Sequence, residues 1–504
     1  MLLGLRAHVK VKENNGQGST DNAGSRQRRK LQHCHVFVIT TTRSMDDRSN
    51  HDADDVFSPL TLRGLTLPNR FIKAATHDGA SLDEIANAYC RLARNGVSLL
   101  TVAYVSISPI HKTFDTQHHI ARSNLAEWTA CVRRVSDAGG QMSAQLHHPG
   151  LFCMASTGRP MGPSLFYLPS KAAWPHVMSQ SDLAAVLAEY VEAARLCVAA
   201  GFVALEIHCG HGYLLSQFLS PLVNRRRDGY GGPRITDRAR FPSEVIRAVR
   251  AAVPPAVPIL VKMNGDDGFC GGLRLAEALI AARLFAAAGA DAIVPSYGYT
   301  SLNGFGMLRG DVPLDQMASA LPVRLARLIV RLLGQWLVPT ISYTSTFLSE
   351  ISRSFVGALD GTGARVVYVG GCDSLASARQ VLADGCAAVQ LGRPLLREPW
   401  FVRKLEAAAR HAASLDAAKR RAATFHLASS DAASRHAAGR DGGESARERD
   451  EPESTSRCTR CNLCTLASID PARFKAGCPL VEMGEGRAWG DIEELSSPGP
   501  LKRL

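Results

Sequence analysis

The sequence lacks several features that would place it in other classes of protein. None of its apolar runs reaches 18 uncharged residues, so we expect no transmembrane helix. No secretory signal precedes its 13 cysteines, so we expect a reducing compartment rather than a disulfide framework. No G-x-G-x-x-G motif opens the first structural unit, which argues against an open, doubly wound dinucleotide-binding sheet.

The net charge of +12 would suggest nucleic-acid binding if the positive residues gathered on an ordered surface. Half of the excess instead lies in residues 1–44, which hold eight lysines and arginines against two acidic residues and show no periodic pattern. We therefore expect no nucleic-acid partner. Three interpretations of residues 1–54 stay open: an Arg-rich transit peptide, a translation start at Met45, or a disordered tail. The expected location is accordingly the cytoplasm or an organelle matrix.

From residue 55 to about residue 410, short apolar runs alternate with longer stretches of helical periodicity. One such stretch, residues 181–200, begins at a serine cap and ends at Gly201. This alternation indicates a parallel sheet covered by helices, and eight such units close most naturally into an α/β fold of the (β/α)8 TIM-barrel type. The strands are expected at residues 71–75, 98–103, 141–146, 202–207, 258–263, 291–295, 365–369 and 387–391.

Three segments depart from this rhythm. Residues 305–364 are too long for one loop and predict an inserted helical segment. Within them, residues 321–336 place arginines on one helical face and leucines with Trp336 on another. Such a helix can lie on a membrane surface, but we favour a lid or a dimer element, which leaves a homo-oligomer open. Residues 411–456 predict a low-complexity linker, and residues 457–504 a cysteine-rich tail.

The active site of such a barrel lies at the C-terminal ends of its strands, and the residues at these ends form a coherent set. Small residues follow the first two strands, where a flat ligand would need room. A Gly-Gly pair follows strand seven and a Gly-Arg pair follows strand eight, which suits a phosphate. A buried lysine on strand five needs an anion or a carbonyl nearby, unless it reaches solvent. The set is Ala75, Ala103, Gln145, His208, Lys262, Gly370, Gly371, Gly392 and Arg393.

A longer stretch carries a family resemblance. Residues 206–232, EIHCGHGYLLSQFLSPLVNRRRDGYGG, with the DRARF that follows, closely resemble the signature of the Old Yellow Enzyme family of FMN oxidoreductases. The resemblance continues, in the family's order, in LPNRFIKAA, AQLHHPG, VKMNGDD, VGG and LGRPLLREP. It covers about residues 57–405, which is most of the chain outside the leader and the tail.

The resemblance implies a barrel that holds one noncovalent FMN. NAD(P)H would reduce this FMN and leave, and an electrophilic small molecule with an activated C=C bond, such as an enone, would then take the hydride. Ala75 and Ala103 would line the flavin face, Gln145 would hydrogen-bond its pyrimidine edge, and Lys262 would lie near its N1/O2 edge. The phosphate would be held by Gly370, Gly371, Gly392 and Arg393.

Within this setting His208 and His211 are interpreted as catalytic residues. Two ring N–H donors that converge on a carbonyl oxygen would polarise a conjugated C=C bond and hold the negative charge that develops. Tyr213 is a candidate proton donor to the α-carbon, or a clamp on the substrate. Zinc at HCGH would need further ligands besides Cys209, and a pair of packed core histidines fits the flanking motif less well.

The tail carries four cysteines, Cys458, Cys461, Cys464 and Cys478, whose spacing suits a [4Fe–4S] cluster or zinc. It resembles the tail of the 2,4-dienoyl-CoA reductase branch of the same superfamily, where a cluster passes electrons to FMN. The third cysteine here follows by two residues rather than three, no further flavin- and nucleotide-binding domains follow, and Thr300 stands about where that branch has a catalytic histidine. A cluster, zinc, and free or packing cysteines therefore all stay open.

Two alternatives to the ene-reductase-like function follow from these features. One is an iron–sulfur flavoprotein of the dienoyl-CoA reductase type, which needs a metal at the tail cysteines. The other is a degenerate barrel that serves as a binding or membrane-surface scaffold through residues 317–336.

Overall fold

The computed structural model describes residues 55–430, with gaps at residues 78, 155, 157, 169–173, 304, 320–323 and 338–339, and residues 454–460 and 462. The predicted leader, half of the predicted linker and most of the cysteine-rich tail lie outside the described residues. Within the described part, eight parallel strands close into a barrel, as predicted. These strands are β3 (Phe71–Lys73), β4 (Leu99–Ser106), β5 (Met142–His147), β8 (Ala204–Cys209), β9 (Ile259–Asp266), β10 (Ala292–Tyr297), β11 (Arg365–Val369) and β12 (Ala388–Leu391).

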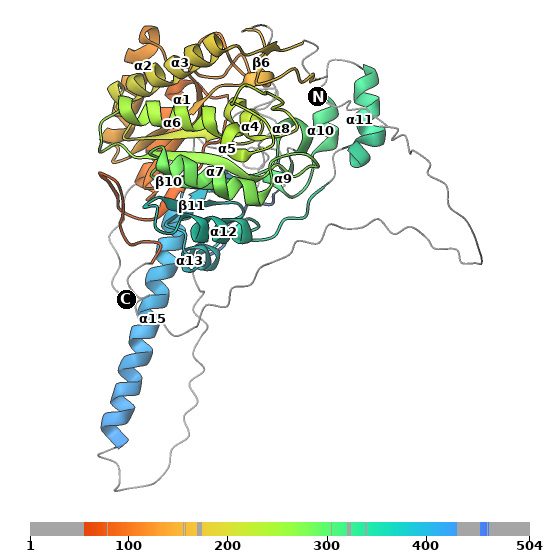
Figure 1. The fold of residues 1–504 in the computed structure, drawn as a ribbon. Helices are drawn as coiled ribbons and strands as arrows, with labels where there is room; N and C mark the ends of the chain where they lie inside the picture. Colours follow the sequence, from red (N-terminus) through yellow and green to blue (C-terminus); the bar gives the residue numbers. More distant parts are fainter. Residues whose placement is uncertain are drawn as a thin grey trace, which may run out of the picture. The chain divides into compact units, whose positions relative to one another are not determined.

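Helices follow the strands and cover the outside of the barrel (Figure 1). Ser81 and Glu84 form a capping box that starts the first of them, and Ser179 with Asp182 starts the third two residues before the expected serine. The larger helices are α1 (Leu82–Arg94), α2 (Leu125–Asp137), α3 (Gln180–Ala199), α6 (Arg240–Ala252), α7 (Leu275–Ala287), α12 (Ser349–Leu359), α13 (Leu375–Ala383) and α15 (Phe401–Ser430). Short helices are α4 (Leu214–Leu219), α5 (Ile235–Arg238) and α14 (Arg393–Arg397), with 3-10 turns at Arg122–Asn124 and Gly150–Phe152.

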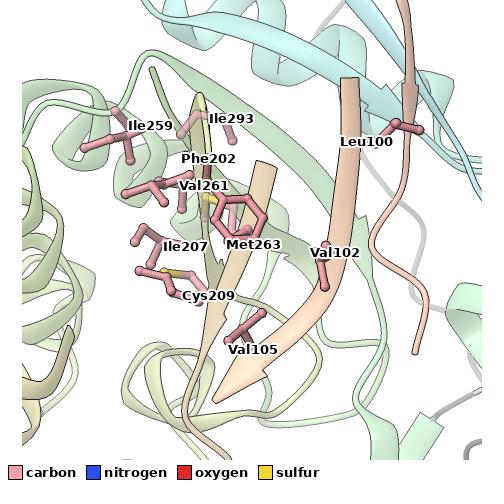
Figure 2. Packing of buried hydrophobic residues seen from close by; sticks show 14 of the residues in the cluster. Leu100, Val102, Val105, Phe202, Ile207, Cys209, Ile259, Val261, Met263 and Ile293 are labelled. Atoms are coloured by element: carbon pink, nitrogen blue, oxygen red, sulfur yellow. The ribbon is translucent and has the colours of Figure 1, made fainter. Parts of the chain in front are cut away.

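The outward faces of the strands form the main apolar core between the barrel and its helices. Figure 2 shows Ile207 and Cys209 of β8 near Val261 and Met263 of β9, all buried. Because side chains alternate along a strand, the residues between them point into the barrel. Strands of this kind are therefore buried on both faces, which is why their sequences read as near-continuous apolar runs.

The inward faces change character along the barrel. At the N-terminal end they are apolar, as at Leu99, Ala204 and Leu260, and they form a second buried cluster. The hairpin of β1 (Leu60–Leu62) and β2 (Leu65–Leu67) contributes three leucines to this cluster and so closes that end. Two and four residues further along β8 and β9 the inward residues become polar, at Glu206 and His208 and at Lys262 and Asn264, which places the chemistry toward the C-terminal end of the barrel.

The segment predicted as an insertion holds both extra helices and a helix of the barrel itself. The extra helices are α8 (Thr300–Asn303), α9 (Phe305–Leu308), α10 (Leu314–Ser319) and α11 (Arg324–Leu337). The last of these matches the predicted amphipathic helix, and its Val330 is buried, but Leu328 and Leu332 are 52% and 68% exposed. The helix that follows, α12, packs on β11 and α7 and belongs to the barrel's outer layer.

Two further elements complete the described chain. A small ladder of β6 (Met161–Gly162) and β7 (His176–Val177) lies in the connection between β5 and α3. Helix α15 continues to Ser430, which is well into the range predicted as a linker. Among the described helices, none combines the length and the apolar character needed to cross a membrane.

Candidate active site

A buried carboxylate, Glu206, lies at the centre of the polar layer inside the barrel. Its side chain is fully buried, and one oxygen accepts a hydrogen bond from Gln145 Nε2 at 2.6 Å and an ion pair from Lys262 Nζ at 3.0 Å. Its other oxygen accepts from Gln390 Nε2 at 2.6 Å. Four strands thus meet at one carboxylate. Lys262 is only 4% exposed, so the alternative in which it reaches solvent is wrong.

The strand register brings these side chains together. Gln145 on β5 pairs with Glu206 on β8, and His208, two residues further along β8, pairs with Lys262 on β9. Sequence reasoning named Gln145 and Lys262 but missed Glu206 and Gln390. The signal was available, because a charged residue inside an apolar strand and two positions before His208 must share the inward face with it.

His208 lies at the C-terminal end of β8 and is 3% exposed. Burial, with smaller contributions from His211, His147 and Lys262, holds the pKa of its ring well below the usual value, so the ring is neutral at pH 7. Its Nδ1 accepts the backbone N–H of Gly210 at 3.2 Å. The proton of the neutral ring is therefore on Nε2, which makes this nitrogen a hydrogen-bond donor.

His211 lies beside it, with the two ring centroids 5.1 Å apart. Burial and Lys262 lower the pKa of His211 to about 3, so this ring is neutral as well. The backbone adopts a left-handed conformation at φ 59°, which is uncommon for a residue with a side chain. The side-chain oxygen of Asn264 accepts the backbone N–H of His211 at 3.0 Å, and Nε2 of His211 contacts Ser296 Oγ at 2.7 Å. These contacts fix both the backbone and the ring.

Tyr213 completes the predicted trio and is 5% exposed. Its ring centroid lies 5.0 Å from that of His208 and 5.5 Å from that of Tyr104. Burial raises the pKa of the phenol, while hydrogen bonds with Tyr104 and Thr300 oppose this rise. The Tyr213 hydroxyl is therefore protonated. The structure brings His208, His211 and Tyr213 together. Thr300 also donates to the carbonyl of His211 at 2.9 Å.

A third histidine, His147, belongs to the same group and was not named from the sequence. It is fully buried at the end of β5, and its ring centroid lies 4.3 Å from that of Tyr213 and 5.7 Å from that of His208. Its Nε2 contacts Thr113 Oγ1 at 3.0 Å, whereas its buried Nδ1 has no hydrogen-bond partner in the described part of the protein. The sequence AQLHHPG could have revealed His147, because His147 is two residues after Gln145 and so shares the inward face of the strand with it.

The predicted phosphate residues lie at the ends of β11 and β12. Gly370 and Gly371 have φ values of 129° and 79°, which a side chain rarely adopts. A Cβ on Gly371 would also lie 2.7 Å from the ring of Phe347, so the chain passes close by. A Cβ on Gly392 would meet no atom closer than 3.7 Å, so the space beside it is open. Arg393, the next residue, donates from Nη1 to the carbonyl of Arg309 at 3.0 Å.

These features fit the FMN that the sequence predicts. Ala103 on β4 is buried and Ala75, after β3, is half-buried, so both leave room at the same end of the barrel. Unpartnered buried atoms, Gln390 Oε1 and His147 Nδ1, are present among the inward side chains, as expected where a polar ligand binds. Arg393 forms no ion pair with a described residue, which leaves its charge for an anion.

Of the cysteine-rich tail, only residues 457–460 and 462 are described. Cys458 is half-buried, and the other three predicted ligands, Cys461, Cys464 and Cys478, lie outside the described residues. The prediction of a cluster or zinc in the tail therefore stays a prediction. Cys197 and Cys386, expected to be packed in the core, are both buried.

A second group of potential metal ligands includes His148, the residue after His147. One nitrogen each of His111 and His148 and one oxygen of Glu189 lie within 4.8 Å of one another. His148 Nδ1 accepts the N–H of Gly150 at 3.1 Å, so its Nε2 carries the proton and is not a ligand in this tautomer. A separation this wide and a protonated nitrogen suit an internal water better than a metal ion.

Comparisons with known proteins place this site in a family. Residues 55–300 match the family model described as the NADH:flavin oxidoreductase / NADH oxidase family. The chain is 33% identical over 367 residues to a 4,4'-dithiodibutanoate disulfide reductase of Rhodococcus erythropolis, which covers 70% of this chain and 88% of that protein. It is 28% identical over 380 residues to an NADPH dehydrogenase of Listeria innocua, which covers 72% of this chain and 97% of that one.

Solved structures agree in fold. Morphinone reductase superposes with a TM-score of 0.54 at 22% identity, covering 71% of this chain and 91% of its own. A 2-naphthoyl-CoA reductase superposes with a TM-score of 0.58 at 19% identity, covering 69% of this chain and 52% of its own. These structures share the barrel fold with the described part of the chain. The chain belongs to the NADH:flavin oxidoreductase / NADH oxidase family and is an FMN-dependent NAD(P)H oxidoreductase.

Glu206→Gln should destabilise the protein strongly, because it leaves the buried ammonium of Lys262 without a counter-charge. We expect the free energy of unfolding to fall by about 3–5 kcal/mol, measured by urea denaturation. The double substitution Glu206→Gln/Lys262→Met should recover part of this loss. A single variant as stable as the parent protein would show that the pair is not an interacting ion pair.

The buried histidines should make stability depend on pH. Burial holds the pKa of His147, His148 and His208 well below that of an unfolded histidine, about 6.5. The unfolded chain therefore binds protons that the folded chain does not, and stability is lost as the pH falls below about 6.5. Each such histidine contributes a slope of at most about 1.4 kcal/mol per pH unit.

This dependence can be measured by urea denaturation at pH 7.5, 6.5 and 5.5. His148→Gln removes one titrating ring, so its profile should be shallower than that of the parent protein. Identical slopes for the two proteins would contradict a neutral His148 in the folded state.

Proposed function

We propose that the C-terminal end of the barrel binds FMN and reduces an electrophilic small molecule with an activated C=C bond, such as an enone. The observation that carries this proposal is the group of His208, His211 and Tyr213, two neutral imidazoles and a protonated phenol, at the end of β8. Reduced by NAD(P)H, the bound FMN supplies the hydride.

The cofactor would lie across the inward polar layer. Ala75 and Ala103 leave space for the ring system, and Gln145 and Lys262 offer hydrogen-bond donors to its pyrimidine edge. Gly370, Gly371, Gly392 and Arg393 would hold its phosphate at the ends of β11 and β12. This assignment agrees with the place where barrels of this kind commonly bind phosphate.

Glu206 changes the role expected for Lys262. The ion pair at 3.0 Å neutralises most of the lysine's charge, yet an ammonium has three donors and only part of them face the carboxylate. Lys262 would therefore act mainly as an oriented hydrogen-bond donor. Glu206 would orient Lys262, and it accepts a hydrogen bond from Gln145 as well.

The histidines would bind the carbonyl oxygen of the acceptor. Because both rings are neutral, they stabilise negative charge on this oxygen by N–H donation, without transferring a proton to it at the outset. His208 Nε2 is the better-defined donor, because Gly210 fixes its tautomer. The Tyr213 hydroxyl would then give its proton to the α-carbon, and its hydrogen bonds with Tyr104 and Thr300 would hold the charge that remains.

A disulfide is a second candidate acceptor. The relative from Rhodococcus erythropolis, to which the chain is 33% identical over 88% of that protein's length, is a disulfide reductase. Hydride addition to one sulfur would break the S–S bond, giving one thiol and one thiolate, and a single proton would then convert the thiolate into the second thiol. Tyr213 would donate this proton.

The proposed cofactor is tested by the absorption spectrum of the aerobically purified full-length protein. We expect flavin bands that bleach when NADH or NADPH is added anaerobically and that return with cyclohexenone or with a dithiodialkanoate. A colourless protein that does not rebind FMN would contradict the proposal. Return of the bands with only one of the two acceptors decides between the C=C and the disulfide function.

His208→Ala should leave FMN bound, because no proposed contact to the cofactor depends on this ring. The loss of one donor to the developing oxyanion should lower the rate of enone reduction about 10²–10³-fold. The measurement is kcat with cyclohexenone, with the rate of flavin reduction by NAD(P)H recorded separately. An unchanged enone rate would contradict the role assigned to the ring.

A further inference from the structure

A short C-terminal segment, residues 454–460 and 462, docks on the end of the barrel where the phosphate is proposed to bind. We refer to it as the docking segment. Its Thr455 forms an antiparallel bridge with Ser374, and its Ser456 N–H donates to the carbonyl of Asp373 at 2.7 Å. The carboxylate of Glu398 accepts from Ser456 Oγ at 3.2 Å and from the Arg457 N–H at 2.5 Å. The docking segment therefore contacts the residues that follow β11 and those that follow β12.

Arg460 holds the middle of the docking segment. Its guanidinium forms an ion pair with Asp373 and lies 4.1 Å from the ring centroid of Tyr343. Its carbonyl oxygen approaches Gly310 so closely that a Cβ on this glycine would lie 2.4 Å from it. Gly310 has a φ of 102°, so both its conformation and this contact require glycine.

Asn462 ends the docking segment and reaches the proposed phosphate residues. It is 1% exposed, and its backbone adopts a left-handed conformation at φ 57°. Its Nδ2 donates to the carbonyls of Asp311 at 2.9 Å and Arg309 at 3.2 Å. Its Oδ1 accepts from Arg393 Nη1 at 2.7 Å. One amide thus joins the docking segment to the inserted segment and to helix α14.

These contacts fix Arg393 by one nitrogen only. Nη1 donates to both Asn462 and the carbonyl of Arg309, whereas Nε and Nη2 make no hydrogen bond with the residues that the structure describes. Nε and Nη2 are the two donors of a guanidinium that bind an oxyanion in a bidentate manner. Nη1 therefore fixes the arginine, while Nε and Nη2 remain available to bind an oxyanion.

We infer that Asn462 is a positioning residue of the cofactor site, which sets Arg393 for the phosphate of FMN. The inference rests on the proposed placement of FMN and adds to it a part of the chain beyond the barrel. An arginine that is already oriented loses less side-chain freedom on binding an anion, so the affinity for the phosphate rises. The docking segment would then contribute to cofactor retention without touching the flavin ring.

The test compares the affinity of the flavin-free, full-length protein for FMN and for riboflavin, which has no phosphate, by quenching of flavin fluorescence. Asn462→Gly removes the side chain and suits the left-handed backbone. We expect it to weaken FMN binding about tenfold and to leave riboflavin binding nearly unchanged. Arg393→Met should act in the same direction, and the double variant should lose little more than Arg393→Met alone.

A control variant separates positioning from docking. Ser456→Ala removes a hydrogen bond between the docking segment and Glu398 and leaves the hydrogen bond between Asn462 and Arg393 in place. Its ratio of FMN to riboflavin affinity should therefore equal that of the parent protein.

The outcomes are distinguishable. If Arg393→Met lowers the ratio and Asn462→Gly does not, the inference is wrong while the FMN site stands. If Asn462→Gly weakens both ligands equally, its role is structural and the inference is again wrong. If Arg393→Met leaves the ratio unchanged, the proposed phosphate placement fails, and the positioning role fails with it.

Discussion

The ion pair between Glu206 and Lys262, inside the barrel, is the constraint on which the polar layer depends. A lysine on the inward face of a parallel strand cannot keep its charge in an apolar barrel without compensation. Glu206 supplies the counter-charge at 3.0 Å, and two glutamines also donate hydrogen bonds to it. Because the four residues come from β5, β8, β9 and β12, this single carboxylate also ties four strands together.

The arrangement divides the barrel interior into layers. Leucines and alanines fill the N-terminal end, the polar layer occupies the middle, and histidines and tyrosines stand at the C-terminal end. Each layer is two residues further along the strands than the one below it, which follows from strand geometry. The uncharged state of His208 and His211 follows from their burial away from solvent and, to a smaller extent, from the positive charge of Lys262. The neutral donors thus result from the same burial that requires Glu206.

The fold could be predicted from the sequence to a large extent, and the site to a lesser one. All eight strands were predicted, because parallel strands that are buried on both faces give short apolar runs at regular intervals. Gln145, His208 and Lys262 were found because they end or interrupt such runs. Glu206, Gln390 and His147 were missed, although alternation places each on the inward face. Which of several polar residues meet depends on the register between strands, and the sequence does not state it.

Contacts between distant parts of the chain were beyond sequence reasoning altogether. In the sequence, Asn462 is only a polar residue between two cysteines. Its hydrogen-bond partner, Arg393, is 69 residues away along the chain. Only the fold reveals that the turn after β12 and the docking segment lie together. The cysteine-rich tail then need not be viewed solely as a metal-binding appendage. In the arrangement that we propose, Asn462 supports the arginine that would hold the cofactor's phosphate, so a substitution of Cys461, the residue before it in the sequence, should affect FMN binding.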